Sequence, residues 1–182
     1  SSDKAKVSVQ NGKITALAAG TATITATAKD GSEIKSDCVV KVLTPGKLSC
    51  SSDAKAWTDL VYGYTNANHA AIELSNSGET TLTDVKAELK DGTAFQIVSS
   101  PAGQISAGNK TTVSVKPVNG LGAGIYSDTL VISTANGSAN VTLKATVAKG
   151  ENTAVVTLTK TSVTSDSVTV SGQVSGAAGE IE

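Results

Sequence analysis

Short runs of alternating polar and apolar residues, separated by turn-forming pairs, constrain the fold of this chain more than any other feature. Residues 21–28 alternate threonine with alanine or isoleucine, the period-two pattern of a strand with one buried face. Asn11-Gly12 separates two further runs, at 7–9 and 13–17. Asn-Gly in this position predicts a two-residue hairpin, because a type I′ turn needs positive φ at both central residues. The first part of the chain is therefore expected to consist of β-strands.

Seven more strands are expected between residues 47 and 149. They are placed at 59–64, 70–75, 84–90, 94–98, 111–116, 127–133 and 139–147. Turn signals rich in Gly, Asn and Pro separate them. Seven short strands in a segment of about 100 residues are typical of an immunoglobulin-like sandwich. The residue pairs predicted for its core are Ile72 and Leu74, Val85 and Leu89, Phe95 and Ile97, Val113 and Val115, Leu130 and Ile132, and Val141 and Leu143.

The remaining segments are expected to be a linker and an incomplete module. Thr44-Pro45-Gly46 reads as a linker (residues 44–46), in which Pro fixes φ and Gly lets the chain swing. Residues 150–182 hold two β runs, at 154–159 and 167–174, which predict the first hairpin of an Ig-like or fibronectin-like module. Two strands cannot bury a core alone. The predicted fold class is all-β, with tandem immunoglobulin-like β-sandwiches, one complete and two partial.

Residues 1–43 resemble the bacterial Ig-like domain, group 2 family. The resemblance rests on Ser1-Ser2-Asp3, on Val7-Ser8-Val9, on the runs at 11–17 and 19–26, and on the closing run at 38–42. It implies the C-terminal half of an Ig-like domain, whose opening strands are expected to precede Ser1. It also implies a surface protein, such as an adhesin, or a secreted multi-modular enzyme.

Residues 47–149 resemble the abnormal-spindle/Hydin type of Ig-like domain and its bacterial relatives. The resemblance begins with the run at 72–78 and the run at 81–85, and Val61-Tyr62-Gly63 stands where the family has Asp-Phe-Gly. It continues with Phe95, Ile97, Ser100-Pro101, Ile105, Ala107-Gly108, the run at 113–115, Gly124, Tyr126 and the run at 130–132. It implies a complete seven-stranded sandwich.

The two cysteines are expected to be free, buried thiols. Cys38 alternates in phase with Val40 and Val42 and should face the core of the first module. Cys50 shares its phase with Leu48, at the start of the second module. Cores of two different modules do not normally share a bridge, although a disulfide is the alternative that a secreted protein allows.

Composition and charge argue against several functions. All 15 basic residues are Lys against 16 acidic ones, so the chain lacks both the basic excess and the Arg forks that read nucleic acid. No apolar run approaches the ~18 residues of a membrane span, so no membrane insertion is expected in this segment. The single histidine, His69, has no triad pattern around it. We therefore expect no catalytic residue, no enzyme activity and no cofactor.

Metal sites are not expected either. One His and two separated Cys cannot form a structural zinc site, and no calcium-binding loop motif is present. Calcium at a module junction, near Asp53 or Asp59, is the one metal alternative. The Gly-rich stretch 119–124 has no following helix to present its amides to a phosphate, so it predicts a flexible connection between strands.

Three of the five aromatic residues, Trp57, Tyr62 and Tyr64, fall within eight positions. Tyr62 and Tyr64 are expected to share one face of a strand. A row of rings could stack on sugars, which makes these three the candidate ligand-binding residues. The favoured alternative is that the rings pack over the module junction that follows Pro45-Gly46.

The favoured function is a non-catalytic structural or adhesive spacer of a secreted or cell-surface bacterial protein, located outside the cell or on its surface. Its expected partners are neighbouring Ig-like modules and a glycan or a host or cell-surface protein. One alternative is a carbohydrate-binding accessory module of a polysaccharide-degrading enzyme. Another is a strand-exchanging subunit of a surface filament, in which an orphan strand fills an incomplete sandwich by β-strand addition. Arbitrary cuts through a longer chain are the favoured explanation of the incomplete ends.

Overall fold

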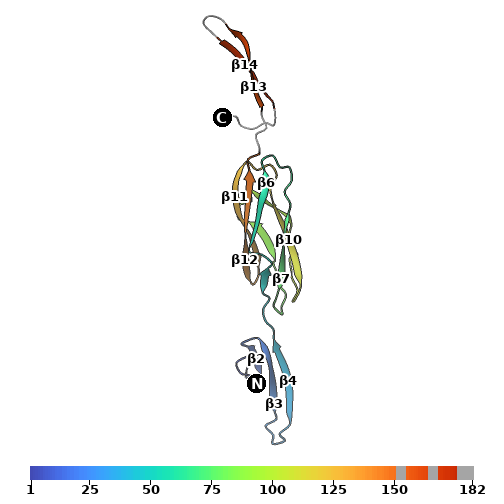
Figure 1. The fold of residues 1–182 in the computed structure, drawn as a ribbon. Coiled ribbons are helices and arrows are strands. Elements are labelled where there is room, and N and C mark those ends of the chain that lie inside the picture. The colour runs from blue at the N-terminus through green and yellow to red at the C-terminus, as the bar shows by residue number, and fades with distance from the viewer. Residues whose placement is uncertain (151–154, 164–167, 176–182) are drawn as a thin grey trace.

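The computed structural model describes residues 1–150, 155–163 and 168–175, and every regular element in this part of the chain is a β-strand. The sheets form three groups that follow one another along the length of the molecule (Figure 1). Two small N-terminal sheets lie at one end, a sandwich of two larger sheets lies in the middle, and a C-terminal hairpin lies at the other end. The all-β prediction is confirmed.

The N-terminal part consists of two antiparallel pairs. The hairpin of β1 (Val7–Gln10) and β2 (Lys13–Ala16) turns at Asn11 and Gly12, whose φ values of 50° and 78° are the positive values expected of Asn-Gly. The second pair is β3 (Gly20–Thr27) and β4 (Lys35–Val42). The buried apolar residues of the N-terminal part are Val7 in β1 and Ala22 in β3.

Both cysteines are free, but the expected burial of Cys38 is wrong. Cys38 pairs with Ile24 in the two-stranded β3–β4 sheet and is exposed to solvent. Among the described residues, no further strand joins that sheet. The alternation of polar and apolar residues predicts which face of the sheet a side chain lies on. Burial also requires a second layer of structure packed on that face. Cys50 is half-buried, and this burial raises the pKa of its thiol.

The central sandwich has two four-stranded sheets. One sheet has the order β5-β7-β10-β9 and the other β6-β12-β11-β8. The strands are β5 (Leu48–Cys50), β6 (Ala54–Val61), β7 (Ala70–Asn76), β8 (Lys86–Leu89), β9 (Phe95–Ser99), β10 (Lys110–Pro117), β11 (Gly124–Thr134) and β12 (Gly137–Ala148). All paired strands are antiparallel except β6 and β12, which run parallel. The sandwich therefore has eight strands, one more than expected.

The core lies between these two sheets and contains most of the predicted residues. Those that are fully buried or nearly so are Ile72, Leu74, Val85, Phe95, Val113, Val115, Leu130, Ile132, Val141 and Leu143. Leu89 and Ile97 are only partly buried and pack against its edge. Leu82 and Ile105 are also fully buried, and they form an isolated antiparallel bridge outside the named strands. The pattern of alternation did not reveal these two, because neither belongs to a regular strand.

Residues 44–46, expected to be a swinging linker, are hydrogen-bonded to the sandwich. Gly46 is buried, and its amide donates a hydrogen bond to Thr80 Oγ1 at 2.7 Å. A Cβ added at Gly46 would lie 2.7 Å from the carbonyl oxygen of Thr80. Gly46 therefore allows two backbone segments to approach closely, because a side chain at this position would collide with Thr80.

At the C-terminus, β13 (Val155–Val163) and β14 (Val168–Ser175) pair antiparallel. Two of the residues in the predicted runs, Ala154 and Ser167, lie outside the described residues. The assignment of this segment to an Ig-like or fibronectin-like module stays a prediction, as does the division of the chain into modules at residues 43, 47 and 149.

Candidate functional site

The three predicted ligand-binding residues surround one hollow at the end of the sandwich where β6 and β12 finish. The hollow has a volume of about 420 Å³. Its lining residues are Trp57, Asp59, Leu60, Val61, Tyr62, Gly63, Tyr64, Asn66, Ala67 and Asn68. The structure thus brings Trp57, Tyr62 and Tyr64 together, although it presents them in three different ways.

The chain bends immediately after β6, which separates the two tyrosines. The Tyr62 amide donates to the carbonyl of Ala148 at 2.8 Å, and the Tyr64 amide donates to the carbonyl of Val61 at 3.0 Å. Gly63 between them has a φ of 87°. The expectation that Tyr62 and Tyr64 share a strand face is wrong, because the strand ends at Val61 and the tyrosines belong to a turn.

Trp57 is a core residue. Its side chain is 7% exposed, and its ring centroid lies 5.7 Å from that of Phe95 at an interplanar angle of 47°. The indole Nε1–H donates to the carbonyl of Asn68 at 2.7 Å, which satisfies the polar atom of a buried tryptophan. Its ring face is used within the sandwich, so it offers no platform for a sugar.

Tyr64 is half-buried and holds a neighbouring loop. Its hydroxyl donates to the carbonyl of Val118, and the hydroxyl of Tyr126 donates to the carbonyl of Gly122 at 3.1 Å. Burial raises the pKa of Tyr64 and outweighs the opposite effect of a hydrogen bond to the backbone at Leu121. The Gly-rich stretch at 119–124, expected to be a flexible connection, is therefore attached to the sandwich near both of its ends.

Tyr62 is the exposed member of the cluster, with 56% of its surface accessible. It lies next to the point where the chain leaves the sandwich, because a Cβ added at Gly150 would lie 4.0 Å from the Tyr62 carbonyl oxygen. Asn136, just before β12, bonds Gly46, whereas Ala148 at the other end of β12 bonds Tyr62. The cluster therefore lies at the exit of the sandwich, and its expected place over the Pro45-Gly46 junction is wrong.

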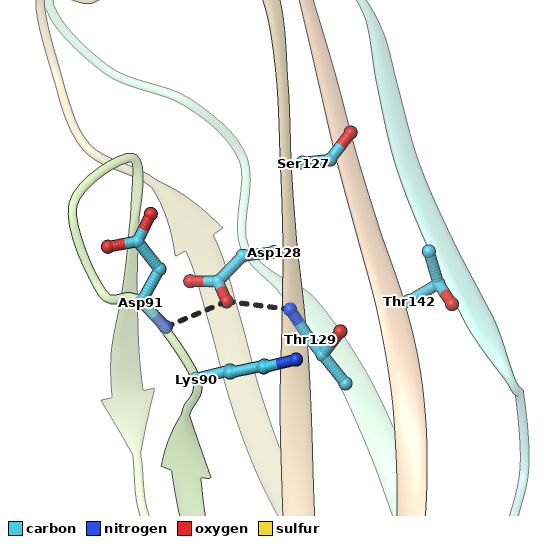
Figure 2. Close-up of a pocket in the computed structure, with 6 residues that line it drawn as sticks. All are labelled: Lys90, Asp91, Ser127, Asp128, Thr129 and Thr142. Carbon is cyan, nitrogen blue, oxygen red and sulfur yellow. Dashed lines mark hydrogen bonds between the residues drawn. The ribbon is translucent and has the colours of Figure 1, made fainter.

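A second hollow, of about 440 Å³, surrounds Asp128 on β11 (Figure 2). The Asp128 carboxylate accepts hydrogen bonds from the amides of Asp91 at 3.1 Å, Gly92 at 2.8 Å and Thr129 at 2.7 Å. Asp128 is only 9% exposed. Burial pushes its pKa up, but the amides of Gly92, Thr129 and Asp91 outweigh this effect, so the pKa is lowered. The carboxylate thus holds the turn between β8 and β9 against β11.

The position of Asp128 in its strand is a sequence signal for a buried carboxylate. Asp128 occupies the same strand phase as Leu130 and Ile132, both fully buried. A charged residue in the apolar phase of a strand requires hydrogen-bond partners, since an unpaired buried charge is costly. Two of its three partners come from a turn 36 and 37 positions earlier in the chain, which no local pattern identifies.

The described part of the chain contains no group of three or more His, Cys, Asp or Glu side chains placed to hold a metal ion. His69 is exposed next to the start of β7. In the same described part, a helix long and apolar enough to cross a membrane is also absent.

Comparison with curated proteins finds no match. Among solved structures, the VesB protease of Vibrio cholerae is 17% identical at a TM-score of 0.40, over 56% of this chain and 31% of VesB. The S-layer protein SbsC is 14% identical at a TM-score of 0.42, over 94% of this chain and 27% of the SbsC chain. A structure of SbsC domains 4 and 5 is 17% identical at a TM-score of 0.37, over 79% of this chain and 66% of that one.

This chain thus spans less than a third of the VesB chain and of the longer SbsC chain. The similarity of residues 47–149 to the abnormal-spindle/Hydin type stays a prediction. The resemblance drawn from the sequence is confirmed for the N-terminal part of the chain: residues 1–39 match the family model of the bacterial Ig-like domain (group 2).

Proposed function

We propose that this chain is a non-catalytic structural spacer of a secreted or cell-surface bacterial protein. The observation that carries the proposal is the position of the entrance and exit of the sandwich. The chain enters beside Asn136, which precedes β12, and leaves after Ala148, at the opposite end of that 12-residue strand. At ~3.3 Å per residue these ends are about 36 Å apart, so each such module adds length to the molecule.

The resemblance of residues 1–43 to group 2 Ig-like domains, which implies surface proteins and secreted multi-modular enzymes, supports the location. Labelling intact cells that produce the protein with antibodies against this chain tests it. We expect labelling without permeabilisation. Labelling only after lysis would contradict an extracellular spacer.

A glycan-binding accessory module is a second candidate function, favoured by the exposed Tyr62 beside the 420 Å³ hollow. A glycan array with the whole chain tests it. If the hollow binds sugar, Tyr62→Ala abolishes binding, while Thr65→Ala, at an exposed position of the same loop outside the hollow lining, keeps it. Absence of binding by the parent chain, or equal binding by both variants, excludes this candidate.

A strand-exchanging filament subunit is supported by the apolar surface of the N-terminal part. Residues exposed by 40% or more in that part are Val9, Ile14, Leu17, Ile34, Val39 and Leu43. Such surface favours cover by a further strand. Light scattering over a hundredfold concentration range tests exchange between copies. Growth of the mass with concentration supports exchange, and a constant monomer mass excludes it.

A further inference from the structure

The connection between the N-terminal part and the sandwich is held by backbone hydrogen bonds. The amide of Glu79 donates to the carbonyl of Thr44 at 2.9 Å, and the amide of Ser77 donates to the carbonyl of Lys47 at 3.0 Å. These bonds precede the pairing of Leu48 with Asn76, where β5 meets β7. Residues 44–47 thus continue the ladder of the sandwich in the N-terminal direction.

Two glycines let the two backbones cross closely at this place. Gly46 and Gly78 are both buried. A Cβ added at Gly78 would lie 2.1 Å from the carbonyl oxygen of Pro45 and 2.6 Å from Gly46 Cα. Because the nearest atoms are backbone, no side-chain rotation relieves this contact. The crossing therefore requires glycine at 78 and leaves little space for the linker to move.

A buried asparagine holds the two crossing backbones together. Asn76 is 1% exposed, and its Oδ1 accepts hydrogen bonds from the amides of Lys47 and Gly78, each at 3.0 Å. Its Nδ2 donates to the carbonyls of Thr80 at 2.8 Å and Ile105 at 2.9 Å. All four hydrogen-bonding positions of the amide are occupied, so its orientation is determined by the surrounding backbone.

Two side chains complete the attachment at the surface. Glu79 Oε1 lies 2.6 Å from Lys41 Nζ in β4, and Glu79 Oε2 accepts from the amide of Thr44 at 2.9 Å. Asn136 Nδ2 donates to the carbonyl of Gly46 at 3.0 Å. Glu79 thus links the sandwich directly to the last strand of the N-terminal part, while Asn136 holds the linker from the β11–β12 turn.

We infer that this junction is a stiff joint, which keeps the β3–β4 sheet and the sandwich in one fixed orientation. The joint consists of the Gly46–Gly78 crossing, the buried Asn76, and the outer contacts of Glu79 and Asn136. This property goes beyond a spacer function and holds wherever the protein is located. A Pro-Gly sequence between modules by itself suggests a hinge, whereas here it forms part of the stiff joint.

Electron–electron double resonance on the full 182-residue chain tests the inference. Nitroxide labels are attached to the exposed thiol of Cys38 and to a thiol introduced by Lys144→Cys, an exposed position on β12. Cys50→Ala removes the remaining thiol. We expect a single narrow distance distribution for this parent.

Two variants weaken the joint in different ways. Gly78→Ala closes the space for the crossing, and the double variant Glu79→Ala/Asn136→Ala removes the outer contacts at exposed positions. We expect each to widen the distance distribution at least twofold. If Gly78→Ala fails to fold by circular dichroism, the double variant alone decides the test.

Matched controls separate the joint from general effects of substitution. Gly103→Ala adds a Cβ in open space, and Glu88→Ala/Asn140→Ala changes the same residue types at exposed positions of β8 and β12. Both controls should keep the parent distribution. A parent distribution as broad as those of the joint variants overturns the inference, and so does a narrow one that every folded joint variant retains.

Discussion

At the scale of single residues, Asp128 is a nearly buried carboxylate of the sandwich whose contribution to folding can be measured. Its carboxylate accepts from three backbone amides, two of them in the connection between β8 and β9. Asp128→Asn turns one acceptor into a donor and removes the charge. We expect a loss of about 1–3 kcal/mol in the free energy of unfolding, measured by urea denaturation at pH 7. Asp53→Asn, at an exposed position, should stay within about 0.5 kcal/mol of the parent. An equal effect of both would contradict the role of Asp128.

The same carboxylate gives a pH dependence with a definite sign. The pKa of Asp128 lies below its ordinary value of 3.8 in the folded protein, because the amide bonds outweigh the effect of burial. The stability that it contributes is therefore fully present above the pKa of the unfolded chain and is lost as pH falls through the lower, folded pKa. We expect the stability difference between the parent and Asp128→Asn to be constant from pH 7 to 5 and to narrow below about pH 4. A difference that grows on acidification would exclude this account.

The aromatic residues of the exit hollow should differ sharply in what they contribute to folding. Trp57 is 7% exposed, whereas Tyr62 is 56% exposed. We expect Trp57→Ala to cost about 3–5 kcal/mol, because it leaves a cavity against Phe95 and an unpaired carbonyl at Asn68. Tyr62→Ala should cost under about 1 kcal/mol. Thermal unfolding followed by circular dichroism compares the two, and similar losses would show that the hollow stabilises the sandwich as a unit.

At the scale of elements, alternation predicts those strands that are long enough to show it. Residues such as Ile72, Leu74 and Val113 were placed in the core correctly because both sheets of a sandwich have one buried face. β5 lies outside the predicted strands because three residues show no period. β6 begins five residues before the predicted strand, and it ends at Val61 rather than at Tyr64 because the chain turns at Gly63. The same displacement affects the candidate site. The sequence predicts the aromatic cluster, but which ring is exposed depends on where β6 ends. The Gly46–Gly78 crossing depends on two backbones that meet only in the folded chain, so no local pattern reveals it.

The isolated bridge between Leu82 and Ile105 is short, but we expect it to contribute substantially to the stability of the sandwich. Each residue donates its amide to the carbonyl of the other, at 2.9 and 3.0 Å, and both side chains are fully buried. Leu82→Ala should cost about 2–5 kcal/mol, like other large-to-small changes in a core. Thr83→Ala, at the adjacent, half-buried position, is the control and should cost under about 1 kcal/mol. Urea denaturation compares them, and a small loss for Leu82→Ala would show that the bridge region is not part of the cooperative core.

At the scale of the whole molecule, the stiff joint should survive mild acid. The Lys41 ammonium, followed by the amide and hydroxyl of Thr44, lowers the pKa of Glu79 to about 2. A lowered carboxyl pKa means that the contact is present above the unfolded pKa and is lost only as pH falls through the folded value. At pH 4 the Glu79 carboxylate is therefore still ionised and bound to Lys41 and Thr44.

We expect the distance distribution between labels at Cys38 and at Lys144→Cys to have the same width at pH 7 and pH 4. Widening at pH 4 with an unchanged circular dichroism spectrum would show that a group with a higher pKa controls the joint. Glu79→Gln provides the matched variant: it loses the ion pair at every pH, so its distribution should be wider than that of the parent and equally wide at both values.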